Sequence, residues 1–328
     1  MYFTEHSLLE MGERFAQQGG QLLALDEVHK YPSWAREIKN LHDRYADLQI
    51  IYTGSSILDM AQQEGDLSRR ALMYELSGLS FREFLDFKHG IKLPILTLEQ
   101  ILSPDFSGFD VFPSAFKPYQ FFDSYLRTGY YPFAKGPVQD YYRQLRQLVR
   151  MVVEYDMAEV KGFDIRQAKK LLQLLFIIAQ QAPFKPNLSR LSQRTNIHRN
   201  SINNYLYYLE EAKLLSLLQH KNYSVSALQK PEKIFLENTN LIYALSHSEP
   251  NIGTIREVFF YNQLNTLHQI NQAPRADFLV DEKYTFEVGG KSKQSQQIRG
   301  LQNAWLVKDN IEHKVAEAIP LWLFGFLY

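Results

Sequence analysis

The sequence predicts an α/β protein in which a parallel sheet is followed by helices, a helix-turn-helix unit and a second, small α/β domain. Three patterns predict it: strand, helix and strand within residues 21–56, two helices and a strand near 188–218, and an acid-bearing helix with two strands within 249–289. The chain has 328 residues and 45% apolar content, enough for two to three domains. We expect segments 1–89, 90–165, 166–248 and 249–328.

Composition excludes several classes of site. Lys plus Arg and Asp plus Glu number 36 each, so any surface for nucleic acid must be local. Without cysteine there are no disulfides or thiolate metal sites, and the nine histidines show no zinc-ligand spacing. The apolar runs are shorter than the ~18–20 residues of a membrane span, and no signal peptide is evident. We expect no membrane partner and a cytoplasmic location.

Residues 21–56 read as one βαβ unit. Leu22–Leu25 runs into Asp26 and Glu27, and Gln49–Tyr52 runs into Thr53-Gly54-Ser55-Ser56. Short apolar runs of this kind predict strands that are buried on both faces of a parallel sheet. Between them, apolar residues at three- and four-residue steps predict an amphipathic helix that begins after Pro32-Ser33. Ligands of such sheets lie at the carboxyl ends of the strands, where the acids and Ser55 fall.

The acid pair has two interpretations. In an ATPase the first carboxylate, Asp26, holds Mg²⁺ and the second, Glu27, activates the water that attacks the γ-phosphate. Alternatively the two acids only favour the start of the following helix. The polar residues after the second strand favour the ATPase interpretation, because a side chain that senses the γ-phosphate lies at that position.

Four stretches, in this order, resemble the prokaryotic AAA-superfamily (AAA+) ATPases whose C-terminal half is a domain of unknown function with a degenerate nuclease fold: residues 25–34, 52–56, 67–70 and 79–84. The resemblance covers nearly the whole chain. It implies a P-loop-type (AAA+) parallel sheet, ATP and Mg²⁺ as cofactors and a homo-oligomer as one possible assembly. The roles that it implies are magnesium ligand for Asp26, catalytic glutamate for Glu27, γ-phosphate sensor for Ser55 or Ser56, and phosphate-directed arginine, in cis or in trans, for Arg70 or Arg69. The arginine pair also fits a solvent-exposed turn.

The sequence departs from that family in one respect. No G-x-x-x-x-G-K-S/T loop occurs in the 328 residues, and 25 residues precede Asp26. Such a loop supplies the backbone N–H groups, lysine and hydroxyl that hold the phosphates and Mg²⁺. We therefore expect a sheet that is incomplete at the N-terminus and little or no ATP binding by the chain as written. We also expect Met1 to be an internal start, or the chain to be a fragment.

The middle of the chain predicts a connector and a winged helix. Residues 90–116 indicate loop with a short helix, and Val138–Val160 indicates a long helix. Leu188 to Leu209 predicts helix, turn and helix, and Leu214–Leu218 predicts a strand. In a DNA-binding interpretation the outer face of the second helix presents Arg199, Asn200, Asn203 and Asn204. A single cation on that face predicts weak, salt-sensitive binding to double-stranded DNA; a protein partner is the alternative.

The last segment carries acids in a nuclease-like order. Glu257 falls in an apolar helix, and Asp277 and Glu287 fall on two strands that a polar turn joins into a hairpin. This order resembles the PD-(D/E)xK nucleases, in which carboxylates bind Mg²⁺ and a lysine two residues after the glutamate assists. That position is Gly289 here, and the first lysine is Lys291. We expect a structural remnant more than an active nuclease, and a buried final strand over Leu321–Leu327.

The leading hypothesis is thus an AAA+ type ATPase without its phosphate loop, coupled to DNA or a protein partner through a winged helix. The alternatives are an ATP-independent DNA- or protein-binding adapter and a Mg²⁺-dependent nuclease.

Overall fold

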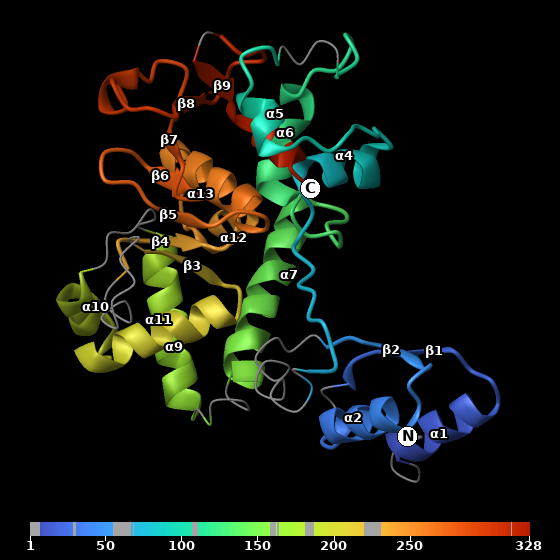
Figure 1. The fold of residues 1–328 in the computed structure, drawn as a ribbon. Helices are drawn as coiled ribbons and strands as arrows, with labels where there is room; N and C mark the ends of the chain where they lie inside the picture. The colour runs from blue at the N-terminus through green and yellow to red at the C-terminus, as the bar shows by residue number, and fades with distance from the viewer. Residues whose placement is uncertain are drawn as a thin grey trace. The chain divides into compact units, whose positions relative to one another are not determined.

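The computed structural model describes residues 7–28, 31–54, 67, 69–106, 111–157, 162, 164–180, 187–219, 231–315 and 317–328. The chain forms two compact units (Figure 1). Residues 1–76 and 155–163 make the first, and residues 77–154 and 164–328 make the second.

The first unit contains the predicted βαβ arrangement. Strands β1 (Leu22–Leu25) and β2 (Gln49–Tyr52) pair in parallel, with helix α2 (Trp34–Arg44) between them in the chain. Helix α1 (Leu8–Gln17) precedes them and packs against α2. A capping box starts α1, because the Ser7 side chain accepts from the Glu10 N–H while the Glu10 carboxylate accepts from the Ser7 N–H. The prediction of strand, helix and parallel strand is confirmed.

The prediction that these strands are buried on both faces is wrong for β1 and β2. Leu23 is buried beneath Leu41 of α2, whereas Leu22 and Ile51 are 50% and 56% exposed. Among the described residues, α1 and α2 cover one face of the pair. The apolar composition of the strands therefore exceeds what this unit buries.

The second unit begins with helices and a helix-turn-helix. Its first helices are α4 (Phe81–His89), α5 (Leu98–Leu102), α6 (Tyr119–Thr128), α7 (Val138–Met151), α9 (Ile165–Ala179), α10 (Leu188–Thr195) and α11 (Arg199–Glu211). A π-helical stretch (Val152–Asp156) continues α7, and its last two residues are counted with the first unit. The antiparallel strands β3 (Leu215–Leu218) and β4 (Lys233–Leu236) follow. The long helix, the helix–turn–helix and the following strand are thus confirmed as elements.

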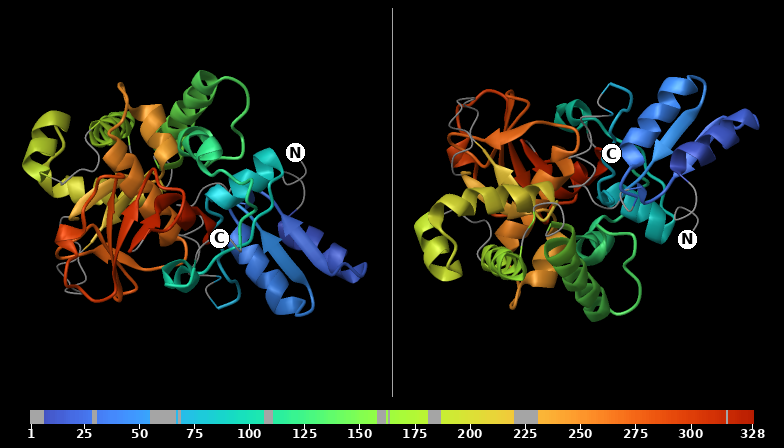
Figure 2. Two further views of the ribbon diagram at one scale, coloured as in Figure 1. Left: turned by 90° about the horizontal axis from the view of Figure 1, so that it is seen from above. Right: turned by 90° about the horizontal axis from the view of Figure 1, so that it is seen from below.

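Helices α12 (Thr239–Leu245) and α13 (Ile252–Asn265) lead into a five-stranded sheet. Its strands, in spatial order, are β5 (Ile270–Gln272), β6 (Phe278–Val280), β7 (Tyr284–Gly289), β8 (Ala304–Lys308) and β9 (Ala318–Pro320). The β5–β6 and β6–β7 pairs are antiparallel, and β7–β8 and β8–β9 are parallel. The red strands lie beside the orange helix α13, which packs on β7 (Figure 2). The predicted β6–β7 hairpin is confirmed.

The expected final strand is instead a 3₁₀-helix. Residues Leu321–Phe326 are all buried, as the apolar run predicts, but they coil after Pro320. Phe324 packs on Phe260 of α13, with ring centroids 4.8 Å apart, and on Phe286 of β7 at 5.8 Å. A short apolar run does not distinguish a strand from a buried helix. Here every residue of the run is buried, so its sequence shows no helical periodicity of polar and apolar positions.

Helix α4 belongs to the second compact unit, which begins at residue 77. The Ser80 hydroxyl donates to the Tyr328 carbonyl at 2.8 Å, and the Phe81 N–H donates to Gln263 Oε1 at 3.2 Å. Phe81 packs edge-on against Phe122 at 5.2 Å. These contacts join α4 to the C-terminal part of the chain. Local sequence patterns do not predict them, because the partners are far apart in the sequence.

Within the described residues, no helix combines the length and apolarity that crossing a bilayer requires.

Candidate functional site

The tips of β1 and β2 bring together an acid and a hydroxyl. Parallel pairing sets Leu25 opposite Tyr52, so Asp26 and Thr53 leave the sheet side by side. The Thr53 N–H donates to the Leu25 carbonyl at 2.8 Å, the Val28 N–H donates to the Thr53 carbonyl at 3.0 Å, and the Thr53 hydroxyl donates to Asp26 Oδ1. The exposed Asp26 side chain therefore has a fixed position at the carboxyl edge of the strands.

Glu27 follows in an unusual backbone conformation. Its φ is +56°, a left-handed value that a residue with a Cβ seldom adopts. The chain thus turns directly after Asp26, and the Glu27 side chain is half-buried. Backbone conformations of this kind are concentrated at functional sites, which makes this turn a candidate for one.

Arg70 is held away from these acids. Its Nε and Nη2 donate to the two carboxylate oxygens of Asp43, at 2.6 and 2.9 Å, and this hydrogen bonding lowers the pKa of Asp43. Trp34 at the start of α2 lies against Tyr52, with ring centroids 5.4 Å apart, so α2 runs back from the strand tips. Asp43 is nine residues along α2 from Trp34, or roughly 13 Å at 1.5 Å per residue. Within this unit the structure therefore does not bring Arg70 to Asp26.

The other residues of the predicted nucleotide site are less constrained. Arg69 is exposed. Ser55 and Ser56, the two sensor candidates, lie outside the described residues.

The helix-turn-helix presents most of the predicted polar residues. Asn196 ends α10 in a left-handed conformation (φ 52°), and the Ser192 hydroxyl donates to the Ile197 carbonyl at 2.7 Å across the turn. Arg199, Asn200 and Asn204 are exposed on α11. Asn203 is half-buried on the same helix, and within the described residues its Oδ1 is buried without a hydrogen-bond partner.

The nuclease-like residues meet at the β6–β7 hairpin, together with a lysine that the pattern did not include. Lys233 Nζ of β4 lies 3.0 Å from Glu257 Oε2 of α13 and 3.1 Å from Asp277 Oδ1. Asp277 Oδ2 accepts from the Val288 N–H at 2.9 Å. The β4 strand thus supplies a cation between the helix acid and the hairpin acid.

Glu287 and Lys291 are placed differently from each other. Glu287 is 1% exposed and pairs with Lys293 Nζ at 2.5 Å. Reorienting the Gln297 amide lets it donate to the same carboxylate, at 2.7 Å from Oε2. Lys291 is exposed, so Lys293 provides the ammonium beside Glu287. Gly289 allows this, since a Cβ there would meet Lys293 Cβ at 2.7 Å.

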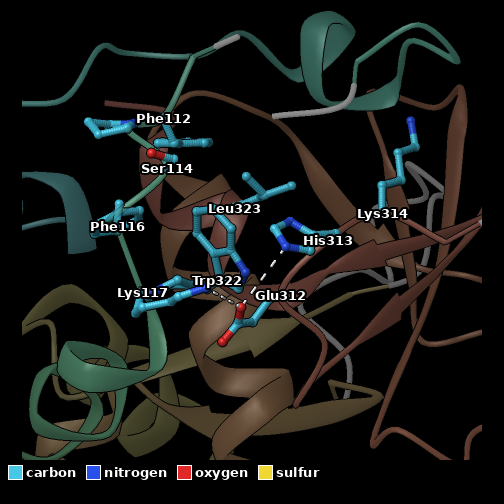
Figure 3. A pocket seen from close by; sticks show the side chains of 11 residues that line it. Phe112, Ser114, Phe116, Lys117, Glu312, His313, Lys314, Trp322 and Leu323 are labelled. Atoms are coloured by element: carbon cyan, nitrogen blue, oxygen red, sulfur yellow. Dashed lines mark hydrogen bonds and ion pairs between the residues drawn. The ribbon is translucent and has the colours of Figure 1, made fainter. Parts of the chain in front are cut away.

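A cavity of about 130 Å³ in the same unit contains none of the predicted site residues. Phe112, Phe116 and Trp322 line it, and in the part of the chain that the structure describes Trp322 Nε1 is buried without a hydrogen-bond partner. Figure 3 shows Lys117 and His313 on either side of Glu312, at 3.4 and 4.0 Å from its Oε2. The Phe- and Pro-rich stretch before α6, residues 112–118, supplies much of the lining, and its sequence carries no pattern of catalytic residues.

Two family models match parts of the chain, and the first of them covers most of the first unit. Residues 2–85 match an AAA domain. Residues 119–252 match a family described as "Domain of unknown function (DUF8612)". The AAA match supports an AAA-like superfamily for this part of the chain.

Two relatives from Methanocaldococcus jannaschii are similar to most of the chain. The uncharacterized protein MJ1637 is 28% identical over 84% of this chain and 63% of its own length. The uncharacterized protein MJ1544 is 24% identical over 74% of this chain and 52% of its own length. The chain therefore spans between half and two thirds of these relatives. Among solved structures, the Walker-type ATPase PABY2304 of Pyrococcus abyssi aligns with a TM-score of 0.38 and 11% identity, over 73% of this chain and 65% of that one.

Proposed function

We propose that the first unit is the Walker B half of an AAA-type ATPase site, in which Asp26 holds the Mg²⁺ of Mg–ATP and Glu27 orients the attacking water. The observation that carries the proposal is the hydroxyl–carboxylate contact between Thr53 and Asp26 at the tips of a parallel strand pair. Ligands of parallel sheets bind at this edge.

The residues at this edge fit a hard divalent cation. Asp26 is exposed, and among the described residues its side chain forms a hydrogen bond with Thr53 alone. Carboxylate and hydroxyl oxygens are ligands that Mg²⁺ accepts, commonly through water. When bound, Mg²⁺ would neutralise charge on the phosphates. In this proposal the Thr53 hydroxyl holds the Asp26 side chain in place, and the turn at φ +56° positions Glu27 beside Asp26.

The site also needs a phosphate loop, which no part of the 328 residues supplies. We expect this chain to bind Mg–ATP with a Kd weaker than about 1 mM. An N-terminal extension with a strand, a G-x-x-x-x-G-K-S/T loop and a helix is expected to bring the Kd to about 10 µM or below. Isothermal titration with Mg–ATP measures both chains.

The control for that titration is the extended chain with the loop lysine replaced by alanine, which is expected to lose most of the gain. An extended chain that folds, as circular dichroism reports, but binds no Mg–ATP would overturn the proposed nucleotide site. Binding that is equal with and without Mg²⁺ would overturn the role of Asp26.

We further propose that α11 couples the ATPase unit to double-stranded DNA. Arg199, Asn200 and Asn204 are exposed together on this helix, and Arg and Asn side chains are suited to reading base edges. Because Arg199 is the one cation of this set, we expect Arg199→Ala to weaken DNA binding about tenfold at low salt. Fluorescence anisotropy with a labelled duplex measures the change. Arg143→Ala, which removes an exposed arginine of α7, is the matched control.

Two outcomes would argue against the DNA role. One is equal weakening by Arg143→Ala and Arg199→Ala, which would indicate nonspecific attraction. The other is no duplex binding at any salt concentration, which would favour a protein partner.

A further inference from the structure

The Lys233 ammonium lies where a divalent cation would bridge two nuclease-like acids. Its Nζ is 3.0 Å from Glu257 Oε2 and 3.1 Å from Asp277 Oδ1. The side chains are 11%, 17% and 17% exposed for Lys233, Glu257 and Asp277, so water screens the group only partly. The two carboxylate oxygens are at most about 6 Å apart, since each contacts the same nitrogen (3.0 + 3.1 Å).

The lysine is charged in this setting. Burial lowers the pKa of Lys233, but the charges of Glu257 and Asp277 and their hydrogen bonds outweigh burial, and the net shift is upward. Burial raises the pKa of Glu257, and the neighbouring Lys233 opposes that shift. The Lys233 ammonium and the Glu257 carboxylate therefore stabilise each other's charge in this partly buried setting.

The third acid offers no alternative cation site. Glu287 is turned to Lys293 at 2.5 Å and is reached by Gln297, while Asp277 Oδ2 already accepts from the Val288 N–H. No group of three or more acidic or histidine side chains in the described part of the chain is arranged to hold a metal ion. The residues of this domain therefore do not fit the Mg²⁺ that the nuclease-like order of its acids implies.

We propose that the Lys233 ammonium takes the place of the divalent cation. The domain is then a structural scaffold that the ammonium stabilises, and it does not cleave phosphodiester bonds. The lysine comes from β4, which pairs with the strand after the helix-turn-helix, and its acids come from α13 and the β6–β7 hairpin. One side chain thus joins the helix-turn-helix strands to the α/β domain without metal. Removing the ammonium leaves two close carboxylates, which is the minimum that a divalent cation needs.

Lys233→Met tests the proposal in the full chain. The variant is expected to unfold at a lower temperature than wild type, because two partly buried carboxylates lose their cation. Mn²⁺ at about ten times its Kd is expected to raise the melting temperature of the variant by about 2–4 °C. The same Mn²⁺ is expected to leave wild type unchanged, and Lys135→Met, which removes an exposed lysine, is the matched control. In Lys233→Met/Glu257→Gln the rescue is expected to disappear.

A folded Lys233→Met that shows no Mn²⁺-dependent shift would overturn the latent cation site. If Lys233→Met does not fold, wild type is titrated with Mn²⁺ and binding is monitored by electron paramagnetic resonance. The proposal requires no Mn²⁺ bound at Glu257. Wild-type binding that Glu257→Gln abolishes would overturn it, as would Mg²⁺-dependent nicking of plasmid DNA that Asp277→Ala abolishes.

Discussion

Glu27→Gln, in a chain extended by a phosphate loop, is expected to lower the rate of ATP hydrolysis by about 10²–10⁴-fold while Mg–ATP binding is retained. Glutamine has the same size as glutamate and can still form hydrogen bonds. It lacks the carboxylate charge, which orients the attacking water and accepts its proton. The turn at φ +56° fixes the backbone of residue 27, so the amide is expected to occupy the place of the carboxylate. Phosphate release at saturating ATP measures the rate, and titration with Mg–ATP measures binding.

Asp47→Asn is the control for this experiment. Asp47 is an exposed acid that precedes β2 at the opposite end of the strand from Thr53, and its substitution is expected to leave both quantities within about twofold. Asp26→Asn is expected to differ from Glu27→Gln, because it weakens Mg²⁺-dependent binding as well as turnover. If Glu27→Gln hydrolyses ATP as fast as the parent chain, Glu27 is not the catalytic glutamate and the proposed role of this residue is wrong.

The first unit shows what local sequence patterns can and cannot predict. Strand, helix and strand follow from periodicity, and the parallel pairing follows from the connection through α2. Burial on both faces does not follow, because covering a sheet depends on elements distant in the chain; Leu22 and Ile51 keep one exposed face. The position of Arg70 also depended on a distant partner, Asp43.

The acids of the C-terminal sheet show that local patterns also fail to predict charge partners. The order of Glu257, Asp277 and Glu287 predicted the helix and the hairpin, and the structure brings the first two acids to one lysine. Lys233 carries no local signal, since it lies 24 residues from Glu257 and 44 from Asp277. Lys293 replaced Lys291 beside Glu287 because the chain after Gly289 folds back, which a count of residues along an extended strand does not anticipate.

A buried amide in the second unit leads to the other large prediction. Asn240 of α12 is 0% exposed. Its Oδ1 accepts from the Tyr130 N–H at 3.0 Å and from the Tyr141 hydroxyl at 2.6 Å. Its Nδ2 donates to the carbonyls of Tyr125 and Leu126 at 3.1 and 2.9 Å. One side chain thus satisfies groups at the end of α6, in the turn that follows and on α7.

Asn240→Leu is expected to lower the free energy of unfolding by roughly 3–5 kcal/mol, because it leaves these donors and acceptors buried and unpaired at about 1–3 kcal/mol each, with partial relaxation. Urea denaturation followed by circular dichroism measures the change. Asn265→Leu, at the exposed last position of α13, is the matched control and is expected to change stability by less than about 1 kcal/mol. A loss of that small size for Asn240→Leu would mean that water or rearranged side chains satisfy the freed groups. In that case α12 would owe its position to its buried apolar residues, Leu241, Ile242, Ala244 and Leu245, and not to the amide.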